Sequence, residues 1–567
     1  MGHGFGSRGV GETAVLVPTR ARALLPPDVI RVLRGAHKVP DGPESGAIGP
    51  WGPSRTGGRD DGGGAVTETM TDTDARTRPE EHGTAAPGID PERLAVCMDV
   101  LARAGELPSD HPDSVALQRA TAGLFKNVKE RRRRERQEAR KAHDRAVLAA
   151  TATAAPDRID DETNGRALTS GSGGALAGVL RKARPCYVCK EKYREVDSFY
   201  HQLCPACAAF NRERRNARTD LTGRRALLTG GRAKIGMYIA LRLLRDGAHT
   251  TITTRFPNDA VRRFAAMPDS DEWLHRLRVV GVDLRDPSQV LGLADAVAEQ
   301  GPLDVLINNA AQTVRRSPGS YGPLIEAEAE PLTGTGLPEP LVLGGVRPRA
   351  LGESPTGGDA GEAVAAPHAL TPSMLTSLAL TTGSASMERV RTGTAIDAGG
   401  LVPDLASENS WTRQIGGIDP VEMLEVQLCN VSAPFLLVDR LRPALAASPA
   451  RRTYIVNVSA MEGVFGRGYK GPGHPHTNMA KAALNMLTRT SAQEMLESDG
   501  ILMTSVDTGW ITDERPHPDK ERLAAAGFHA PLDLEDGVAR VYDPVVRGEL
   551  GEDLYGCFLK DYAPANW

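Results

Sequence analysis

The chain has 567 residues, 68 of them basic and 72 acidic, so its formal net charge is −4. A balance this even excludes a chain-wide electrostatic attraction to nucleic acid or to an anionic membrane. The 60 glycines and 40 prolines, with only 4% aromatic residues, are unusual for one compact fold, so part of the chain is expected to be disordered. No apolar run approaches the roughly 20 residues of a membrane span, and the N-terminus shows no signal-peptide pattern. Four of the seven cysteines lie in CxxC pairs, which suits a reducing cytoplasm better than a disulfide framework.

Residues 1–88 are predicted to form a disordered leader. Glycine runs and scattered prolines and arginines fill this stretch, which therefore has too little apolar surface to bury a core. Met1 and Met70 are alternative start positions between which the sequence does not decide.

A helical segment is predicted over residues 89–155. Asp90 followed by Pro91 is typical of a helix start, and a second helix is expected to begin near Asp113. That helix continues into a basic stretch, 129–136, in which glutamates and arginines lie at helical spacing. A solvated helix face is the favoured interpretation. Nucleic-acid binding is the weaker alternative, because acidic residues interrupt the run.

A small metal-binding module is predicted over residues 184–218, after a Gly/Ser-rich linker at 156–183. Two CxxC pairs separated by fourteen residues supply the ligands, which are Cys186, Cys189, Cys204 and Cys207. Four thiolates at this spacing are typical of a tetrahedral zinc site with no open position, so the zinc is expected to be structural. It would supply on the order of 10 kcal/mol of folding free energy. Thiol redox chemistry, or His201 as a replacement ligand, are the alternatives. The basic segment 212–218 is predicted to be a solvated linker helix.

From residue 219 to 567 the sequence alternates short apolar runs with helix-period patterns, which predicts the α/β class with a doubly wound parallel sheet of the Rossmann type. The predicted strands are Arg225–Thr229, His249–Thr254, Arg278–Val282, Val305–Asn308, Tyr454–Val458 and Leu502–Val506. The first strand ends in a glycine turn that opens a helix, an arrangement that holds a dinucleotide pyrophosphate. A Gly- and Pro-rich insertion at 314–417 is predicted to be a partly ordered lid or a disordered loop, with a short helix at Ser373–Leu380.

Two motifs of this part resemble those of the short-chain dehydrogenase/reductase family. The family's Thr-Gly-x-x-x-Gly-x-Gly turn matches at Thr229, Gly230 and Gly236, and Lys234 stands at its middle glycine. The family's Asn-Asn-Ala-Gly motif matches at 308–311, with alanine at the last position. Together with the strand ends, the resemblance implies that the cofactor contacts are Thr229, Gly230, Gly231, Arg232, Ile235, Gly236, Arg255, Asp283, Leu284, Asn309, Ala310, Ala311, Lys481, Thr508, Gly509 and Thr512.

The cofactor is predicted to be NADP(H) rather than NAD(H). NAD-specific proteins of this fold carry an acidic residue at the end of the second strand, where this chain has Arg255. A guanidinium suits a 2′-phosphate, and Arg232 in the glycine turn is a second candidate for the same contact. Asp283 and Leu284 are expected to line the adenine.

The catalytic positions implied by the resemblance are only partly retained. The family's fifth strand ends in two serines, which correspond here to Ser459 and Ala460. The family's Tyr-x-x-x-Lys places both side chains on one helix face, where the lysine lowers the phenol pKa for proton exchange with the substrate. Lys481 matches, but Thr477 stands at the tyrosine position, and an aliphatic hydroxyl is a far poorer acid. Because the family's lysine also binds the nicotinamide ribose, retention of Lys481 favours cofactor binding. The stretch Thr508–Thr512 resembles the family's Pro-Gly-x-x-x-Thr segment beside the nicotinamide, with threonine at the proline position and one residue fewer before Thr512.

Two further residues are candidates for catalysis. His476 precedes Thr477 and titrates near neutral pH when unperturbed, so it is the candidate replacement for the missing proton donor. A surface histidine without a role is the alternative. Asn430 lies on a helix expected over 420–441 and resembles the family's catalytic and structural asparagine. An ordinary interior asparagine is the alternative there.

The sequence thus predicts an NADP(H)-dependent oxidoreductase with an atypical acid/base site, acting on a small carbonyl or alcohol substrate. A catalytically reduced, nucleotide-binding scaffold or sensor is the second hypothesis, in which the zinc and helical parts bind a partner. A nucleic-acid-binding regulator is the third. A homo-oligomer is expected from the family resemblance. A cytoplasmic location, without membrane contact, is expected from the cysteine pattern and the absence of targeting signals.

Overall fold

The computed structural model describes residues 88–155, 158, 175–344, 371–380, 385–468, 470–511 and 514–567. The chain divides into two compact units, one that ends at Arg133 and one that begins at Arg134. Except for Gly88, the predicted leader lies outside the described residues, as do most of the predicted linker and parts of the insertion.

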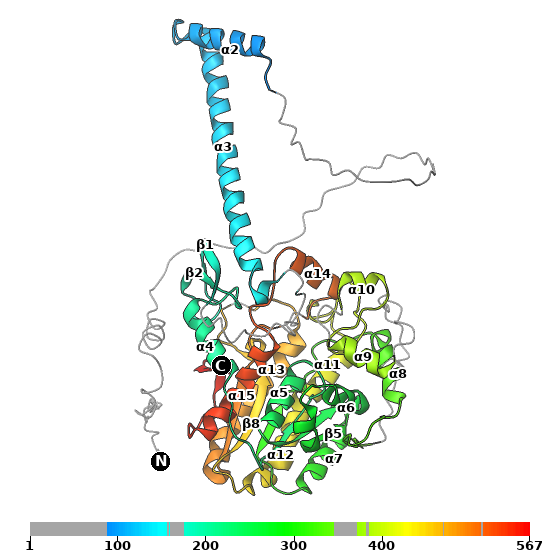
Figure 1. Ribbon diagram of the computed structural model, residues 1–567. Coiled ribbons are helices and arrows are strands. Elements are labelled where there is room, and N and C mark those ends of the chain that lie inside the picture. The colour runs from blue at the N-terminus through cyan, green and yellow to red at the C-terminus, as the bar shows by residue number, and fades with distance from the viewer. Residues whose placement is uncertain are drawn as a thin grey trace, which may run out of the picture. The chain divides into compact units, whose positions relative to one another are not determined.

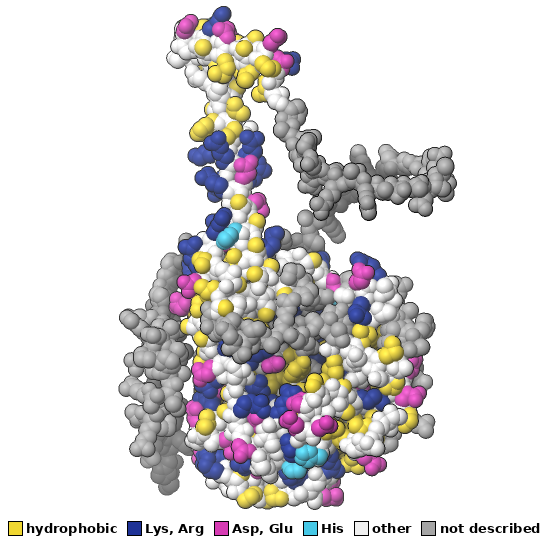
Figure 2. Space-filling view, in the orientation of Figure 1, with side chains coloured by type: hydrophobic (Ala, Val, Ile, Leu, Met, Phe, Trp, Pro, Cys, Tyr) yellow, Lys and Arg dark blue, Asp and Glu magenta, His cyan; other side chains and the backbone are white. Residues whose placement is uncertain are grey.

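Two helices make up the described part of the first unit, α2 (Pro91–Ala104) and the beginning of α3 (Pro112–Ala149). The Asp90 carboxylate accepts a hydrogen bond from the Arg93 N–H at 3.0 Å, and Pro91 is the first helical residue, which confirms the predicted helix start. The basic stretch lies on α3, where Lys and Arg side chains gather along an exposed surface (Figure 2). Its role in nucleic-acid binding stays a prediction.

A nine-stranded sheet forms the centre of the second unit (Figure 1), in the order β11-β10-β9-β8-β6-β3-β4-β5-β7. The strands are β3 (Arg225–Leu228), β4 (His249–Thr254), β5 (Leu277–Gly281), β6 (Val305–Asn308), β7 (Leu341–Val342), β8 (Thr453–Ser459), β9 (Ile501–Asp507), β10 (Phe558–Lys560) and β11 (Ala563–Ala565). Every neighbouring pair is parallel except β10 with β11. The predicted fold class is confirmed, and its six predicted strands are present.

Helices cover both faces of the sheet, as the two hydrophobic clusters on it show. The first cluster takes in residues of α5 (Lys234–Arg245), α6 (Pro257–Ala265) and α15 (Leu534–Glu549). The second takes in residues of α7 (Pro287–Ala298), α12 (Ala433–Ala446) and α13 (Pro475–Asp499). The remaining helical elements here are η3 (Ser270–Glu272), η4 (Leu274–Arg276), α11 (Pro420–Gln427), η6 (Leu428–Ser432), η7 (Met461–Gly463) and α14 (His517–Ala525).

One described helical segment, Pro420–Ala446, is long and apolar enough to cross a membrane by length and composition alone. It consists of α11, the π turn η6 and α12, and 44% of its most apolar window is buried. Leu437 and Leu441 of α12 are fully buried against α7 and the sheet, as in the core helix of a Rossmann domain.

The cysteine-bearing module packs directly on the Rossmann domain. It contains η2 (Ala152–Ala154), the antiparallel strands β1 (Leu176–Pro185) and β2 (Lys192–Asp197), and α4 (Pro205–Arg215). Residues 176–183, which the composition assigned to a linker, are therefore part of a strand. The module shares one hydrophobic cluster with Ile511, Leu532 and Leu534. Its core is therefore completed by the larger domain.

The segment 212–218 is not a solvated linker. Arg215 is buried, and its guanidinium donates to Asp533 Oδ2 at 2.8 Å, while Arg214 donates to Asp543 Oδ1 at 3.1 Å. Arg218 binds Asp246. These arginines join α4 and its extension to carboxylates of the Rossmann domain, because a buried charge needs a partner.

The described part of the insertion contains four short helical elements and one strand. It contains η5 (Pro318–Tyr321), α8 (Gly322–Ala329), the edge strand β7, α9 (Pro372–Ala379) and α10 (Met387–Arg391). The helix α9 coincides within one residue at each end with the predicted short helix. Phe256, just after β4, is in one buried hydrophobic cluster with Tyr321, Leu324 and Leu375 of the insertion. The described part of the insertion is thus ordered at the carboxyl edge of the sheet.

Candidate functional site

Hydrogen bonds join the glycine turn to the Asn-Asn-Ala motif at the carboxyl end of the sheet. Thr229 Oγ1 accepts hydrogen bonds from the N–H groups of Asn309 and Ala310, each at 3.0 Å. In return, Asn309 Nδ2 donates to the carbonyl oxygens of Thr229 and Gly230 at 3.0 and 3.2 Å. The two motifs that carried the family resemblance therefore build one structure, and the turn has a fixed shape before any ligand binds.

Three glycines of the turn have no room for a side chain, among them Gly231, where a Cβ would lie 2.5 Å from the Ile252 Cβ. Gly230 has a φ of 70°, and a Cβ there would lie 2.9 Å from the Ala310 Cα. A Cβ on Gly236 would overlap the carbonyl oxygen of Gly230 and lie 2.8 Å from Asn309 Nδ2. Helix α5 can begin this close to the strand only without those side chains, and its N-terminal N–H groups then face the turn where a pyrophosphate would bind.

Arg255 lies at the carboxyl end of β4 and is half-buried. Its guanidinium stacks over the rings of Phe256 and Tyr321, with centroid distances of 5.8 and 5.6 Å, and it forms no ion pair within the described residues. Arg232 differs, because its guanidinium is already bound to Asp259 Oδ2 at 2.6 Å and to the Gly399 carbonyl oxygen at 2.8 Å.

The predicted adenine contacts, Asp283 and Leu284, follow β5, the strand next to β4 in the sheet. Asp283 follows β5, and its carboxylate accepts hydrogen bonds from the Arg285 guanidinium, the shortest at 2.6 Å, which helps to hold its pKa below the usual range. Leu284 is buried in the core beside α7. The Asp283 carboxylate therefore has an internal partner, while the backbone after β5 is at the edge where an adenine would lie.

Lys481 of α13 is buried beside the end of β8. Its Nζ donates a hydrogen bond to the Val458 carbonyl oxygen at 2.8 Å. Burial lowers its pKa to about 8, because the low-dielectric surroundings disfavour the charged amine. Asn430 lies in the π turn η6, and its side chain binds both the N–H and the carbonyl oxygen of Gln312, at 2.7 and 2.9 Å. Single π turns are frequent at functional sites, and this one fixes the loop that follows β6.

The hydroxyl of Ser459 is hydrogen-bonded to a side chain of the protein itself. It donates to Asn485 Oδ1 at 2.5 Å and is buried. Thr477 is also buried, and its Oγ1 has no hydrogen-bond partner among the described residues. Asn485 was not identified from the sequence, although it lies one turn beyond Lys481 on the same helix, and this spacing was a usable signal.

His476 is buried, and neither of its ring nitrogens has a hydrogen-bond partner within the part of the chain that the structure describes. Burial, and to a smaller extent the neighbouring His474, lower its pKa. His474 itself stacks on Trp411 of the insertion, with ring centroids 4.0 Å apart. An unpartnered buried imidazole is costly for the fold, so its two nitrogens are available to a ligand.

The segment that the resemblance assigns to the nicotinamide side is described through Ile511 and lies next to the cysteine module. Thr508 and Gly509 follow β9, and Gly509 has a φ of 77°. The Trp510 N–H donates to the Tyr187 hydroxyl at 2.9 Å. Thr512 lies outside the described residues. Ala311 is exposed at the end of its motif.

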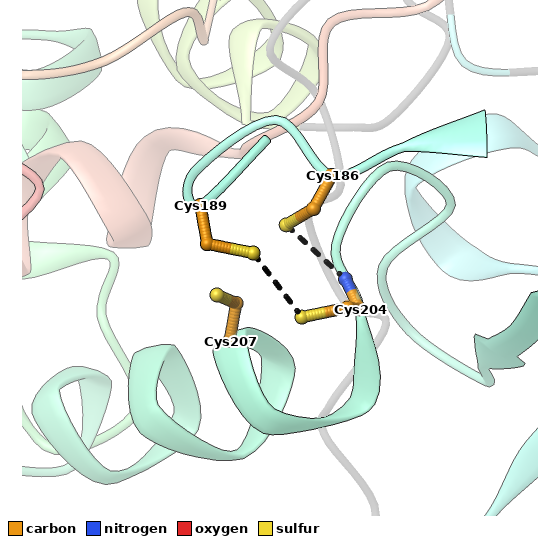
Figure 3. A group of neighbouring side chains, drawn as sticks. All are labelled: Cys186, Cys189, Cys204 and Cys207. Atoms are coloured by element: carbon orange, nitrogen blue, oxygen red, sulfur yellow. Dashed lines mark hydrogen bonds between the residues drawn. The ribbon is translucent and has the colours of Figure 1, made fainter. Parts of the chain in front are cut away.

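The four cysteines form a compact cluster in which every sulfur lies within 4.8 Å of the others. Figure 3 shows all four side chains pointing toward a common centre. The Cys189 and Cys204 sulfurs are 3.7 Å apart, close to the ~3.8 Å that a tetrahedral ion with Zn–S bonds of about 2.3 Å requires. Hydrogen bonds within the cluster lower the pKa of Cys186 and raise the pKa values of Cys204 and Cys207, because one sulfur that loses its proton accepts from neighbours that keep theirs. This donor set fits a structural zinc ion.

Sequence comparisons place the chain among known proteins. The short chain dehydrogenase family model matches residues 224–322. An uncharacterized protein of Acanthamoeba polyphaga mimivirus is 31% identical over 375 residues, which are 64% of this chain and 71% of that protein. A probable oxidoreductase of Streptomyces antibioticus is 39% identical over 94 residues, 16% of this chain and 30% of that protein. The ketoacyl reductase HetN of Nostoc is 29% identical over 120 residues, 21% of this chain and 40% of its own length.

Among solved structures, an NADPH-bound carbonyl reductase from chicken fatty liver is similar at 18% identity and a TM-score of 0.37, with 62% of this chain and 98% of that chain covered. The match of residues 224–322 to the family model, together with the motifs and the sheet described above, defines the class of protein. This chain belongs to the short-chain dehydrogenase/reductase family, a family of oxidoreductases. It spans well under half the length of the Streptomyces and Nostoc relatives.

Proposed function

We propose that the protein is an NADP(H)-dependent oxidoreductase that interconverts a small carbonyl compound and its alcohol at an atypical acid/base site. The observation that carries this proposal is Arg255, whose half-buried guanidinium has no carboxylate partner among the described residues. It lies at the strand end where this fold binds the adenosine ribose. Gly230 and Gly236 shape the pyrophosphate turn beside it, and Lys481 lies at the nicotinamide end.

NADP(H), when bound, supplies or accepts the hydride. The chain's own residues then have two tasks. Lys481 donates hydrogen bonds to the nicotinamide ribose. His476 moves the proton, since reduction of a carbonyl needs a proton at the oxygen as hydride reaches the carbon. Its two buried, unpartnered nitrogens are available for this transfer.

Arg255→Ala should weaken NADPH binding by about tenfold to a hundredfold and leave NADH binding unchanged, because a hydrogen bond between charged groups contributes ~1.5–3 kcal/mol. Calorimetric titration of the parent and the variant with both cofactors measures this. Arg440→Ala, an exposed arginine on α12, is the matched control. Equal affinities of the parent for NADPH and NADH would show that the choice of cofactor was wrongly assigned.

His476→Ala should lower turnover at least tenfold, since general acid catalysis typically supplies ~10²–10⁴-fold, and should leave NADPH affinity unchanged. His249→Ala, at the exposed start of β4, is the control. Because the pKa of His476 lies below its ordinary value, the imidazolium is lost as pH rises through that lowered pKa. Carbonyl reduction by the parent should therefore slow with rising pH in the acidic range. A variant as active as the parent would eliminate His476 as the acid.

We also propose that the cysteine cluster binds one structural zinc. Elemental analysis of protein purified without added metal should find about one equivalent, and the four thiols should resist modification until a chelator is added. Less than half an equivalent, with four reactive thiols in the native protein, would contradict the zinc site.

A nucleotide-binding scaffold or sensor is the second candidate function. Two observations favour it: Asn485 holds the Ser459 hydroxyl, and Thr477 stands at the family's tyrosine position. This protein would bind NADPH without consuming it. A cytoplasmic location and a homo-oligomeric state remain part of the proposal and are checked by fractionation and by light scattering.

A further inference from the structure

The cysteine cluster is connected to the cofactor side of the Rossmann domain through one side chain. Tyr187 lies between the first two cysteines, and its hydroxyl accepts the hydrogen bond from the Trp510 N–H at 2.9 Å. Within the part of the chain that the structure describes, this is the single hydrogen bond that the Trp510 N–H donates. Trp510 directly follows Thr508 and Gly509, the pair assigned to the nicotinamide end of the cofactor, so the Tyr187 hydroxyl holds the backbone of that segment.

The module also supplies the packing behind this segment. Its hydrophobic cluster includes Ile511 and Leu532, and Ile235 at the start of α5 packs against it. Gly509 has a φ of 77°, and a Cβ there would lie 2.6 Å from Leu532 Cδ1. Leu532 belongs to the Rossmann domain, so the start of α5 and the segment after β9 share one hydrophobic cluster with the module.

Tyr187 is fixed in turn by the cysteine turn. Its N–H donates to the Gln202 carbonyl oxygen at 2.7 Å, and its ring lies under Lys190 and Lys560 at 5.1 and 5.7 Å. Because Tyr187 adjoins Cys186, a movement of the cysteine turn would move the hydroxyl that holds Trp510.

We infer that Tyr187 is a positioning residue through which the cysteine cluster holds the Thr508–Trp510 segment for the nicotinamide end of NADP(H). Cofactor affinity therefore depends on metal in the cluster. The inference rests on the proposed function, and it assigns the module a role in regulating that same site. Loss of the metal weakens binding of the nicotinamide half more than binding of the adenosine half.

Tyr187→Phe in the full, metal-loaded chain tests this directly. NADPH should bind about three- to tenfold more weakly, the loss expected from one hydrogen bond. Binding of 2′,5′-ADP, which lacks the nicotinamide, should be unchanged. Hydrogen exchange of the peptide that contains Trp510 should be faster. The matched control is Tyr193→Phe, whose hydroxyl donates to the His201 carbonyl oxygen inside the module at 2.8 Å. It should leave the ratio of NADPH to 2′,5′-ADP affinity and the exchange at Trp510 as in the parent.

Parental NADPH affinity together with parental exchange at Trp510 in the Tyr187→Phe variant would overturn the inference. An equal loss of both affinities would also overturn it, since this would report general damage. Chelation of the parent should reproduce the selective loss of NADPH affinity. If chelation unfolds the chain, the measurements on the metal-loaded Tyr187→Phe variant alone test the inference. If the parent protein binds neither NADPH nor 2′,5′-ADP, the proposed function is overturned, and the inference with it. If only the inference fails, the parent protein still binds NADPH.

Discussion

Replacing Gly236 with alanine is expected to weaken NADPH binding at least a hundredfold. A Cβ at this position would overlap the Gly230 carbonyl oxygen, which is backbone and cannot rotate aside, and would press on Asn309 Nδ2. The turn that presents N–H groups to the pyrophosphate must therefore open. Overpacking of this kind also costs roughly 1–3 kcal/mol of unfolding free energy. Calorimetry with NADPH and denaturant unfolding measure the two effects.

Gly292→Ala is the control for this substitution. Gly292 lies inside α7, and a Cβ there would meet nothing within 4 Å. This variant should bind NADPH like the parent and gain about 0.5–1 kcal/mol of stability, because alanine is the better helix former. Parental NADPH affinity in the Gly236→Ala variant would show that the glycine turn is not the cofactor site.

Lys481→Ala is expected to reduce kcat/KM at least a hundredfold and to weaken NADPH binding at least tenfold. The lysine contacts the cofactor ribose in the proposed site, and a hydrogen bond from a charged donor contributes ~1.5–3 kcal/mol. Its Nζ already donates to the Val458 carbonyl oxygen at 2.8 Å, so the side chain is held in place before the cofactor binds. Arg489→Ala, exposed on the same helix, should match the parent in both measurements.

The pH dependence of NADPH affinity gives Lys481 a second signature. Burial lowers its folded-state pKa to about 8, so the ammonium is present below that pH and is lost as pH rises through it. NADPH affinity of the parent should therefore fall above pH 8, and the Lys481→Ala variant should lack this fall. An unchanged affinity of that variant, or a parent whose affinity stays flat through pH 8, would remove Lys481 from the cofactor site.

Much of the Rossmann domain could be predicted because its signals are local. The predicted strands His249–Thr254 and Val305–Asn308 coincide with β4 and β6, since short β-branched runs between helix-period patterns identify buried parallel strands. The strands β7, β10 and β11 were missed. They are two or three residues long. The pairing of β7 with β5 and of β10 with β9 joins distant parts of the chain, and β11 only pairs back on β10.

The candidate site, like the fold, was predictable where its signals lie within one short stretch of sequence. The glycine turn and the cysteine cluster are spacing patterns within one stretch of sequence, and the structure brings their members together. The contacts that determine what each side chain can do join residues farther apart: Arg232 with Asp259 over 27 residues, and Tyr187 with Trp510 over 323. Tertiary packing creates these pairs, and no local pattern encodes them.

The central claim is tested most directly by the consumption of NADPH. Metal-loaded parent protein is incubated with NADPH and a broad panel of aldehydes, ketones and imines, and loss of the reduced nicotinamide absorbance is followed. The account predicts turnover with at least one carbonyl compound, lost in Gly236→Ala and reduced at least tenfold in His476→Ala. Tight NADPH binding without turnover on any member of the panel would contradict the enzyme and leave the nucleotide-binding scaffold.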